Sequence, residues 1–560
     1  MSISATIPFS TNLLQRLTGL LLLLLLCGCA ANDTRSRMSP VENQLMAEIA
    51  LQRGEYLIAA QEYLVLAEQS DNPDYAQRAT ELAYDYSFLV YAMAAAERWA
   101  GLQPEDQLVH AYLGRLYLRS NMPGEAFGSL DISLGPADRR TDADYFLLSA
   151  ELAELTAPAR GLEVFRLFNE SYPGNPAITG SLASLAYLAG NTGLAVDAAR
   201  ETLLLAPDLT ITRVWLAQYL LADGQRSSAF EQMAFALEMQ PGLEMEIEFI
   251  RLLVRADEFE DARQRLERML SRYPDEPDLI RLRGTLSLQL QDYQAATEDF
   301  SYLLSEAYYV GESFWYLGQI AYEQEQYLQA IRFFKRVGEG SRQTAAVNAI
   351  SRSYLALGDV NTALTVQREY LIRFPREVIP QAPVRAELLA AADQLPEAIE
   401  TMDSAIEFDP WNEALWLSRG ALYERAGDMD EALDSFREAC RFAPNDAGAL
   451  NALGFTLTIT GRDYDEAYEL ISRALELQPD NPAIMDSMGW ILFKTGDKAA
   501  ARGWLEKAYE NYPDPEIAAH LGELLWVEGE PEAAREVWMS SLEQNPDSRV
   551  LNETMERLLP

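Results

Sequence analysis

A ladder of alanines at nearly constant spacing constrains this sequence more than any other feature. From residue 195 to residue 534, an alanine recurs every 33 to 35 residues. The ladder consists of Ala195, Ala229, Ala262, Ala296, Ala330, Ala363, Ala398, Ala432, Ala467, Ala501 and Ala534. Prolines keep a similar step, at Pro173, Pro207, Pro241, Pro274, Pro375, Pro410, Pro444, Pro479, Pro513 and Pro546. Because so regular a spacing needs the same structural unit each time, we expect stacked copies of one supersecondary motif.

The clearest copies lie between residues 445 and 546. In each, a glycine follows a large apolar residue, an alanine opens a second apolar run 12 or 13 residues later, and a proline closes the unit; the glycines are Gly454, Gly489 and Gly522. Small residues let two helices approach closely, and proline, which lacks an N–H, stops the second helix. A period near 34 residues is typical of the tetratricopeptide repeat. The sequence therefore predicts an all-α tetratricopeptide-repeat solenoid, a right-handed superhelix of roughly fifteen stacked helical hairpins.

We expect five segments along the chain. They are a lipoprotein signal peptide (1–28), a flexible tether (29–39), N-terminal helical and tetratricopeptide repeats (40–340), C-terminal repeats (341–547) and a capping tail (548–560). The division near 340 rests on residues 337–344, which carry two glycines and lack the closing proline, so we expect a bend there. The first helix, with an apolar face formed by Val41, Leu45 and Ile49, fits either a cap on the array or a docking helix for another protein.

The first 28 residues have the parts of a secretory leader. Arg16 is the basic element, and an unbroken leucine run, too short to span a bilayer, occupies residues 20–26. The ending Leu26-Cys27-Gly28-Cys29 resembles a bacterial lipobox. That resemblance implies cleavage after Gly28 and attachment of a thioether diacylglycerol and an N-acyl chain such as palmitate to Cys29. Several acyl chains make a permanent anchor.

The residue that follows the cysteine bears on the destination. It is Ala30 rather than aspartate, which by the sorting logic of this lipoprotein class implies an outer membrane, with the protein facing the periplasm. The alternative is ordinary signal cleavage, with Cys29 left as a free thiol.

The charge balance restricts the partners. The chain has 45 lysines and arginines against 86 aspartates and glutamates, a net charge of −41. Such a surface argues against nucleic acid and favours basic protein partners. Of the three cysteines only Cys440 lies in the body of the chain, so a disulfide within the array is excluded and Cys440 is expected to be a small core residue.

The sequence offers no catalytic chemistry. The only histidines, His110 and His520, are about twelve repeats apart, which excludes a histidine pair for a metal. A Gly-rich phosphate loop and a GxSxG elbow are both missing. We therefore predict a chain that is not an enzyme, with no catalytic residue, no metal, no cofactor and no small-molecule substrate.

Partner binding is expected on the concave wall formed by the first helix of each repeat. Positions one turn away from the buried small residue should face this groove. In the last three repeats they are Asn451, Phe455, Asp486, Trp490, Phe493, Glu523 and Trp526. Large aromatics on such a wall match the anchors found at protein interfaces, although Trp490 and Trp526 fit equally well as fillers between repeats. The Lys/Asn clamp with which some arrays hold a peptide carboxylate does not recur at these positions.

The amino-acid sequence of the last repeats is more specific than the general repeat pattern. The segments NALGFTL (451–457), NPAIMDSMGWILFKTGD (481–497) and PDPEIAAHLGELLWVEG (513–529) resemble a family of proteobacterial outer-membrane tetratricopeptide lipoproteins. The family includes the lipoprotein partner of a periplasmic carboxyl-terminal processing protease. The resemblance implies an adaptor that tethers this serine protease and presents peptidoglycan endopeptidases, which tend to be basic, for degradation. The alternative is a scaffold for envelope-polymer export or outer-membrane assembly machinery.

Overall fold

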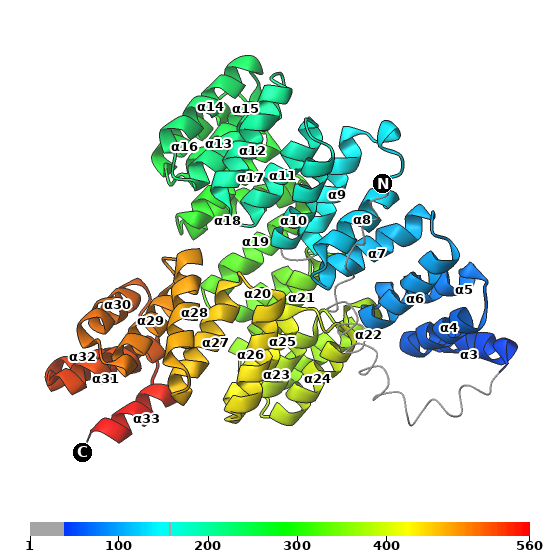
Figure 1. Ribbon diagram of the computed structural model, residues 1–560. Helices are drawn as coiled ribbons and strands as arrows, with labels where there is room; N and C mark the ends of the chain where they lie inside the picture. The colour runs from blue at the N-terminus through cyan, green and yellow to red at the C-terminus, as the bar shows by residue number, and fades with distance from the viewer. Residues whose placement is uncertain (1–38, 156–157, 560) are drawn as a thin grey trace, which may run out of the picture. The chain divides into compact units, whose positions relative to one another are not determined.

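The computed structural model describes residues 39–155 and 158–559, and the regular structure of these residues is helical throughout (Figure 1). The chain divides into two compact units, residues 1–109 and residues 110–560. The lipobox and Cys29 lie outside the described residues. The all-α tetratricopeptide-repeat solenoid predicted from the ladder is confirmed, whereas the five predicted segments stay a prediction.

The described part of the first unit consists of four helices and the start of a fifth. They are α3 (Pro40–Arg53), α4 (Tyr56–Gln69), α5 (Pro73–Asp85), α6 (Leu89–Leu102) and the first residues of α7 (Gln107–Arg119).

Helix α3 differs from the expectation in the face that it buries. Val41 and Leu45 of the predicted apolar face are 75% and 59% exposed. The buried residues are Asn43, Ala47 and Ala50. The small alanines let α4 approach closely, and that contact determines the orientation of α3 more strongly than its hydrophobic periodicity does.

The second unit continues the same alternation of first and second helices. Its elements are α8 (Pro123–Ser133), η1 (Ala137–Arg139), α9 (Asp142–Leu155), α10 (Pro158–Ser171), α11 (Pro176–Leu188), α12 (Thr192–Leu205), α13 (Thr210–Ala222), α14 (Arg226–Met239), α15 (Leu243–Arg255), α16 (Phe259–Leu270), α17 (Pro277–Gln289), α18 (Tyr293–Ser305), α19 (Val310–Glu323), α20 (Tyr327–Phe334), α21 (Gln343–Ala356), α22 (Val360–Arg373), η2 (Pro375–Glu377), α23 (Ala382–Ala391), α24 (Leu395–Phe408), α25 (Glu413–Ala426), α26 (Met429–Phe442), α27 (Ala447–Thr460), α28 (Tyr464–Leu477), α29 (Pro482–Thr495), α30 (Lys498–Asn511), α31 (Pro515–Glu528), α32 (Pro531–Gln544) and α33 (Arg549–Leu558). In the described residues, the thirty helices α3 to α32 thus form fifteen successive pairs, and α33 follows the last of them.

The alanine ladder marks the places where the two helices of a hairpin meet. Each of its eleven alanines, from Ala195 to Ala534, is 0% exposed and lies near the start of a second helix. The ladder prolines follow the second helices at a distance of two to four residues, as Pro479 follows α28 and Pro513 follows α30. Both predicted roles, close packing for alanine and helix termination for proline, are confirmed.

Glycines in the first helices sit under large side chains of the second helices. A Cβ added to Gly489 would lie 2.6 Å from Cγ of Leu505, and one added to Gly454 would lie 2.7 Å from Cγ1 of Ile471. A Cβ on Gly522 would overlap the indole of Trp538. No side chain fits at these three positions without a shift of the opposite helix, so glycine sets the distance between the helices.

Short polar motifs set the ends of the helices in the last repeats. Asn481 and Asp514 follow the ladder prolines and accept hydrogen bonds from the backbone N–H groups of Ala483 and Glu516 (3.0 and 2.8 Å), which caps α29 and α31. At the other end of α29, Gly496 adopts the left-handed conformation with φ of 100°, which costs glycine little and ends the helix.

A buried arginine joins distant repeats within the second unit. Arg160 of α10 is 8% exposed. Its guanidinium donates hydrogen bonds to the carbonyl oxygens of Arg119 (2.8 Å) and Phe442 (2.7 Å) and contacts Glu413 (3.3 Å). A second ion pair joins Arg119 to the buried Asp409 at 3.4 Å. The array of this unit therefore turns back until α10 meets the end of α26.

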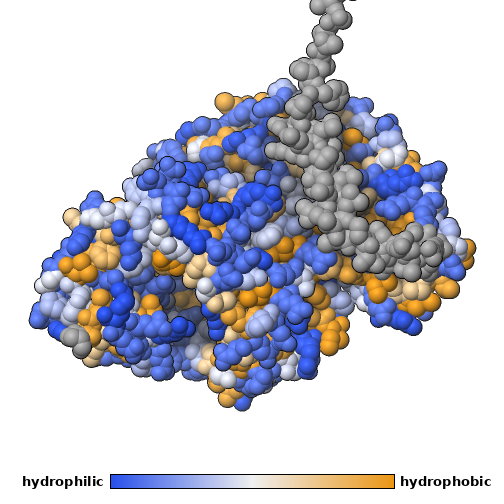
Figure 2. Space-filling view, turned by 60° about the horizontal axis from the view of Figure 1, so that its bottom comes forward, coloured by the Kyte–Doolittle hydropathy of each residue, from blue (hydrophilic) through white to orange (hydrophobic). Residues whose placement is uncertain are grey.

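The end of the array is covered by an amphipathic helix. Helix α33 packs on α31 and α32, and its Leu551 is fully buried in the last hydrophobic cluster. On the face shown in Figure 2, hydrophilic residues predominate and hydrophobic residues form small separate patches. This surface agrees with the high net charge.

Two glycines of one hairpin test the packing rule. We expect Gly489→Ala to destabilise the protein by about 1–3 kcal/mol, because the new methyl group pushes against Leu505 and the carbonyl of Ala501. Gly503→Ala, on the exposed face of α30 with nothing within 4 Å, should stabilise it by about 0.5–1 kcal/mol through higher helix propensity. Urea unfolding followed by circular dichroism measures both changes, and equal effects of the two substitutions would contradict the packing rule.

Candidate functional site

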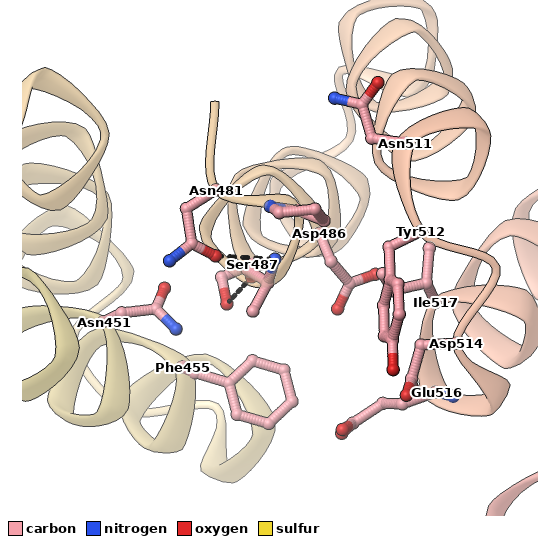
Figure 3. Close-up of a pocket in the computed structure, with 12 residues that line it drawn as sticks. Asn451, Phe455, Asn481, Asp486, Ser487, Asn511, Tyr512, Asp514, Glu516 and Ile517 are labelled. Carbon is pink, nitrogen blue, oxygen red and sulfur yellow. Dashed lines mark hydrogen bonds between the residues drawn. The ribbon is translucent and has the colours of Figure 1, made fainter. Parts of the chain in front are cut away.

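A cavity of about 550 Å³ opens on the first helices of the last three repeats (Figure 3). Its wall comes from α27, from the start of α29, from the last residue of α30, and from the loop before α31 with the first turn of that helix. The lining residues are Asn451, Phe455, Asn481, Pro482, Ala483, Asp486, Ser487, Asn511, Tyr512, Asp514, Glu516 and Ile517. Helices α27, α29 and α31 contact one another in this order, so the cavity lies on the wall that the sequence predicts to bind partners.

The repeat architecture places these side chains. Asn481 and Asp514 are held at the rim because they cap α29 and α31. In Figure 3 the ring of Phe455 and the carboxylates of Asp486 and Glu516 point toward the same central space. Each of these three residues lies on a different first helix, so the cavity needs all three repeats.

The structure brings only some of the predicted groove residues to the cavity. Asn451, Phe455 and Asp486 line it. Trp490 is 5% exposed and fills the space between repeats, which is the second of the two interpretations that its position allowed. Its indole stacks on the ring of His520, with 3.9 Å between the ring centroids, and the ammonium group of Lys494 lies 4.2 Å from its centroid.

The other three predicted groove residues lie beyond the cavity. Glu523 is buried and pairs with Arg557 of α33. Phe493 and Trp526 are half-buried and pack into the last hydrophobic cluster. Contact of these seven residues with a partner stays a prediction.

His520 belongs to the site but is not among the residues predicted for it from the sequence. Its Nδ1 lies 3.0 and 2.9 Å from the two carboxylate oxygens of Asp486. Burial lowers the pKa of His520, but the neighbouring carboxylates of Asp486, Glu516 and Glu523 outweigh that effect, so the pKa is raised above its ordinary value. The signal was available in the sequence as a histidine 34 residues, one repeat, after Asp486.

Two more glutamates that the prediction did not include give this wall its electrostatic character. Displacement of water raises the pKa of Glu516, an effect that His520 opposes and that Asp486 and Asp514 reinforce. Burial also raises the pKa of Glu424 on α25, with repulsion from Glu516 adding to it. Neither glutamate pairs with an arginine or lysine in the described part of the chain. Among the described residues, Glu516 and Glu424 thus lack a lysine or arginine counter-ion, whereas Asp486 pairs with His520.

The remaining candidate chemistry is limited. Cys440 packs beside the hydrophobic cluster of α26 to α29, and burial raises the pKa of its thiol to about 12, which keeps it protonated and unreactive. Among the described residues, no group of three or more His, Cys, Asp and Glu side chains could hold a metal ion. In the same residues, no helix is long and apolar enough to cross a membrane.

Comparison with known proteins agrees with this architecture. Sequence models of the tetratricopeptide repeat match residues 247–309, 413–456 and 446–514. A TPR repeat-containing protein of Pseudomonas aeruginosa is 29% identical over 214 residues, which cover 37% of this chain and 35% of that protein. A CTR9 homologue of Arabidopsis thaliana is 23% identical over 286 residues, which cover 47% of this chain and 25% of that protein. The matches thus span about a third and a quarter of the length of these two relatives.

Two solved structures align with the chain at low similarity. The APC/C hetero-tetramer Cut9-Hcn1 aligns with 94% of this chain and 98% of its own, at 14% identity and a TM-score of 0.36. A tetratricopeptide repeat protein from Parabacteroides merdae aligns with 45% of this chain and 99% of its own, at 15% identity and a TM-score of 0.36. The chain is a tetratricopeptide-repeat protein with a bacterial relative that carries the same repeat, and such repeats form protein–protein interaction scaffolds.

The pKa shifts at the site predict how stability varies with pH. Because the pKa of His520 is raised in the folded state, its contribution is complete below the unfolded value of about 6.5 and is lost as pH rises through the folded value. The raised pKa values of Glu516 and Glu424 act in the same direction at lower pH. We therefore expect the last repeats to unfold at lower urea concentration at pH 8 than at pH 6, measured by hydrogen exchange of peptides from α29 and α31.

His520→Asn serves as the control for this prediction, since it removes the titrating ring. The variant should lose the part of the pH dependence that lies above pH 6.5. A variant that keeps the full dependence there would show that other groups cause it.

Proposed function

We propose that this chain is a non-catalytic adaptor, anchored to the outer membrane through Cys29 and facing the periplasm. In this role it binds a periplasmic carboxyl-terminal processing serine protease and presents protein substrates such as peptidoglycan endopeptidases to it. The observation that carries the proposal is the acidic cavity on the first helices of the last three repeats. The same three repeats contain the segments that resemble the outer-membrane lipoprotein family.

The charge of the chain supports a basic client. A net charge of −41 attracts basic proteins over several ångströms and speeds their association. Peptidoglycan endopeptidases, which the family resemblance implies as clients, tend to be basic. The carboxylates of the cavity, whose lining includes no lysine or arginine, add a local site to this general attraction.

A reconstituted degradation assay tests the adaptor role. Purified processing protease and a basic peptidoglycan endopeptidase are mixed with and without the mature chain, and loss of the endopeptidase is followed over time. We expect the chain to accelerate degradation. Phe455→Ala should reduce that acceleration about tenfold, which corresponds to the loss of an interface anchor of about 1.4 kcal/mol. Phe455 is a better probe than Trp490, because Trp490 is buried and its truncation would also destabilise the fold.

Tyr468→Ala is the matched control, because Tyr468 is an exposed aromatic on the second helix α28. It should leave the acceleration unchanged, and both variants should keep the helical melting curve of the parent chain. If affinity purification recovers export or assembly components and neither protease nor hydrolase, the adaptor proposal is wrong and the scaffold alternative replaces it.

The anchor has its own test. Cys29→Ser removes the thiol that would carry the diacylglycerol, so we expect the variant to leave the outer-membrane fraction and appear in the soluble periplasm. Cys27→Ser is the control, since it changes a neighbouring cysteine that the lipobox does not lipidate. Fractionation followed by immunoblotting measures both, and retention of the Cys29→Ser variant in the membrane would contradict lipidation at this residue.

A further inference from the structure

The cavity of the last repeats is lined by hydrogen-bond acceptors in excess of donors. Three of its lining residues, Asp486, Asp514 and Glu516, carry carboxylates, and the lining includes neither lysine nor arginine. Charge complementarity therefore favours a ligand that donates hydrogen bonds and carries positive charge.

The protein's own cations do not supply this group. His520 neutralises part of the charge of Asp486 but approaches it through Nδ1 from the buried side, where it stacks on Trp490. Glu516, at the exposed mouth of the cavity, makes no ion pair with a lysine or arginine among the described residues, and His520 offsets the rise in its pKa only in part. A metal ion is a poor candidate, because the described carboxylates do not gather into a group that could bind one.

The remaining walls fit a long side chain. The ring of Phe455 faces the same space as the carboxylates (Figure 3), where it can stack against a flat cation. Pro482, Ala483 and Ile517 supply apolar surface for a methylene stem. The volume of about 550 Å³ exceeds that of a single side chain and leaves room for peptide backbone beside it.

We propose that this cavity binds an arginine side chain from an extended segment of the partner protein. The guanidinium carries five N–H donors in a plane, so it can donate to Glu516 and Asp486 while stacking on Phe455. Lysine offers a single point charge and no flat face. The proposal rests on the proposed function in so far as the arginine belongs to a bound protein, and it defines the chemistry that the groove selects.

Saturation-transfer difference NMR with the full mature chain tests this assignment, because it detects weak ligands of large proteins. The probes are N-acetyl-arginine amide, its uncharged isostere N-acetyl-citrulline amide, and N-acetyl-lysine amide. We expect a saturable signal from the arginine compound and little from the citrulline compound. Glu516→Gln and Phe455→Ala should each weaken arginine binding about threefold to tenfold.

Glu469→Gln is the control, since it removes the same charge from the second helix α28, on the other side of the hairpin. It should bind the arginine compound as the parent does. Circular dichroism melting curves establish that the variants fold, and Glu516 is exposed, so its replacement leaves the core intact. Equal signals from citrulline and arginine, equal affinity for lysine, or binding that survives both cavity substitutions would each overturn the assignment.

The outcomes separate this inference from the adaptor role. Arginine binding without capture of a protease or hydrolase would leave the cavity assignment standing and remove the proposed function. Capture and degradation that depend on Phe455, in a chain that does not bind the arginine compound, would support the proposed function and overturn the cavity assignment.

Discussion

The distance between the two helices of each hairpin is the constraint on which the rest of the structure depends. An alanine at the start of the second helix is fully buried in every rung of the ladder, and glycines such as Gly489 leave no space for a side chain. One hairpin cannot bury its apolar face alone, so each must stack on the next. Because the same close contact between helices recurs in each hairpin, the same small residues recur along the chain with little variation.

This constraint is local, and it made the fold predictable from the sequence. The all-α repeat architecture follows from the period, because the same residue types perform the same packing each time. Contacts between distant repeats leave no such trace. Nothing in the sequence relates Arg160 to Phe442, 282 residues away, and only the folded chain brings its guanidinium to the carbonyl of that residue. Likewise, the contact with α4 determines which face of α3 is buried. The apolar periodicity, which predicted the face with Val41 and Leu45, does not.

The candidate site was predictable in part, for a related reason. The rule that groove residues lie beside the small residue of the first helix located Asn451, Phe455 and Asp486, which line the cavity. It could not distinguish Phe455 from Trp490, which occupies the equivalent position one repeat later. Trp490 is covered because His520 of the following repeat stacks on it, whereas Phe455 borders the cavity. Exposure at such a position therefore depends on the residues of the neighbouring repeats as well as on the position within a repeat.

The same dependence explains how a repetitive scaffold acquires a single specific site. The packing residues are fixed, but the first-helix positions beside them are free to vary, and here they change from rung to rung: Asn451 precedes Asp486, and Phe455 precedes Trp490. The wall acquires a preference for one kind of ligand only where an aromatic ring and several carboxylates fall on three successive first helices, with no lysine or arginine in the lining. Because His520 holds Asp486 from the buried side, that carboxylate is fixed in place before any partner arrives. The entropy cost of ordering this carboxylate is therefore incurred on folding and not on binding. A preorganised acceptor of this kind favours tighter association with a flat cation.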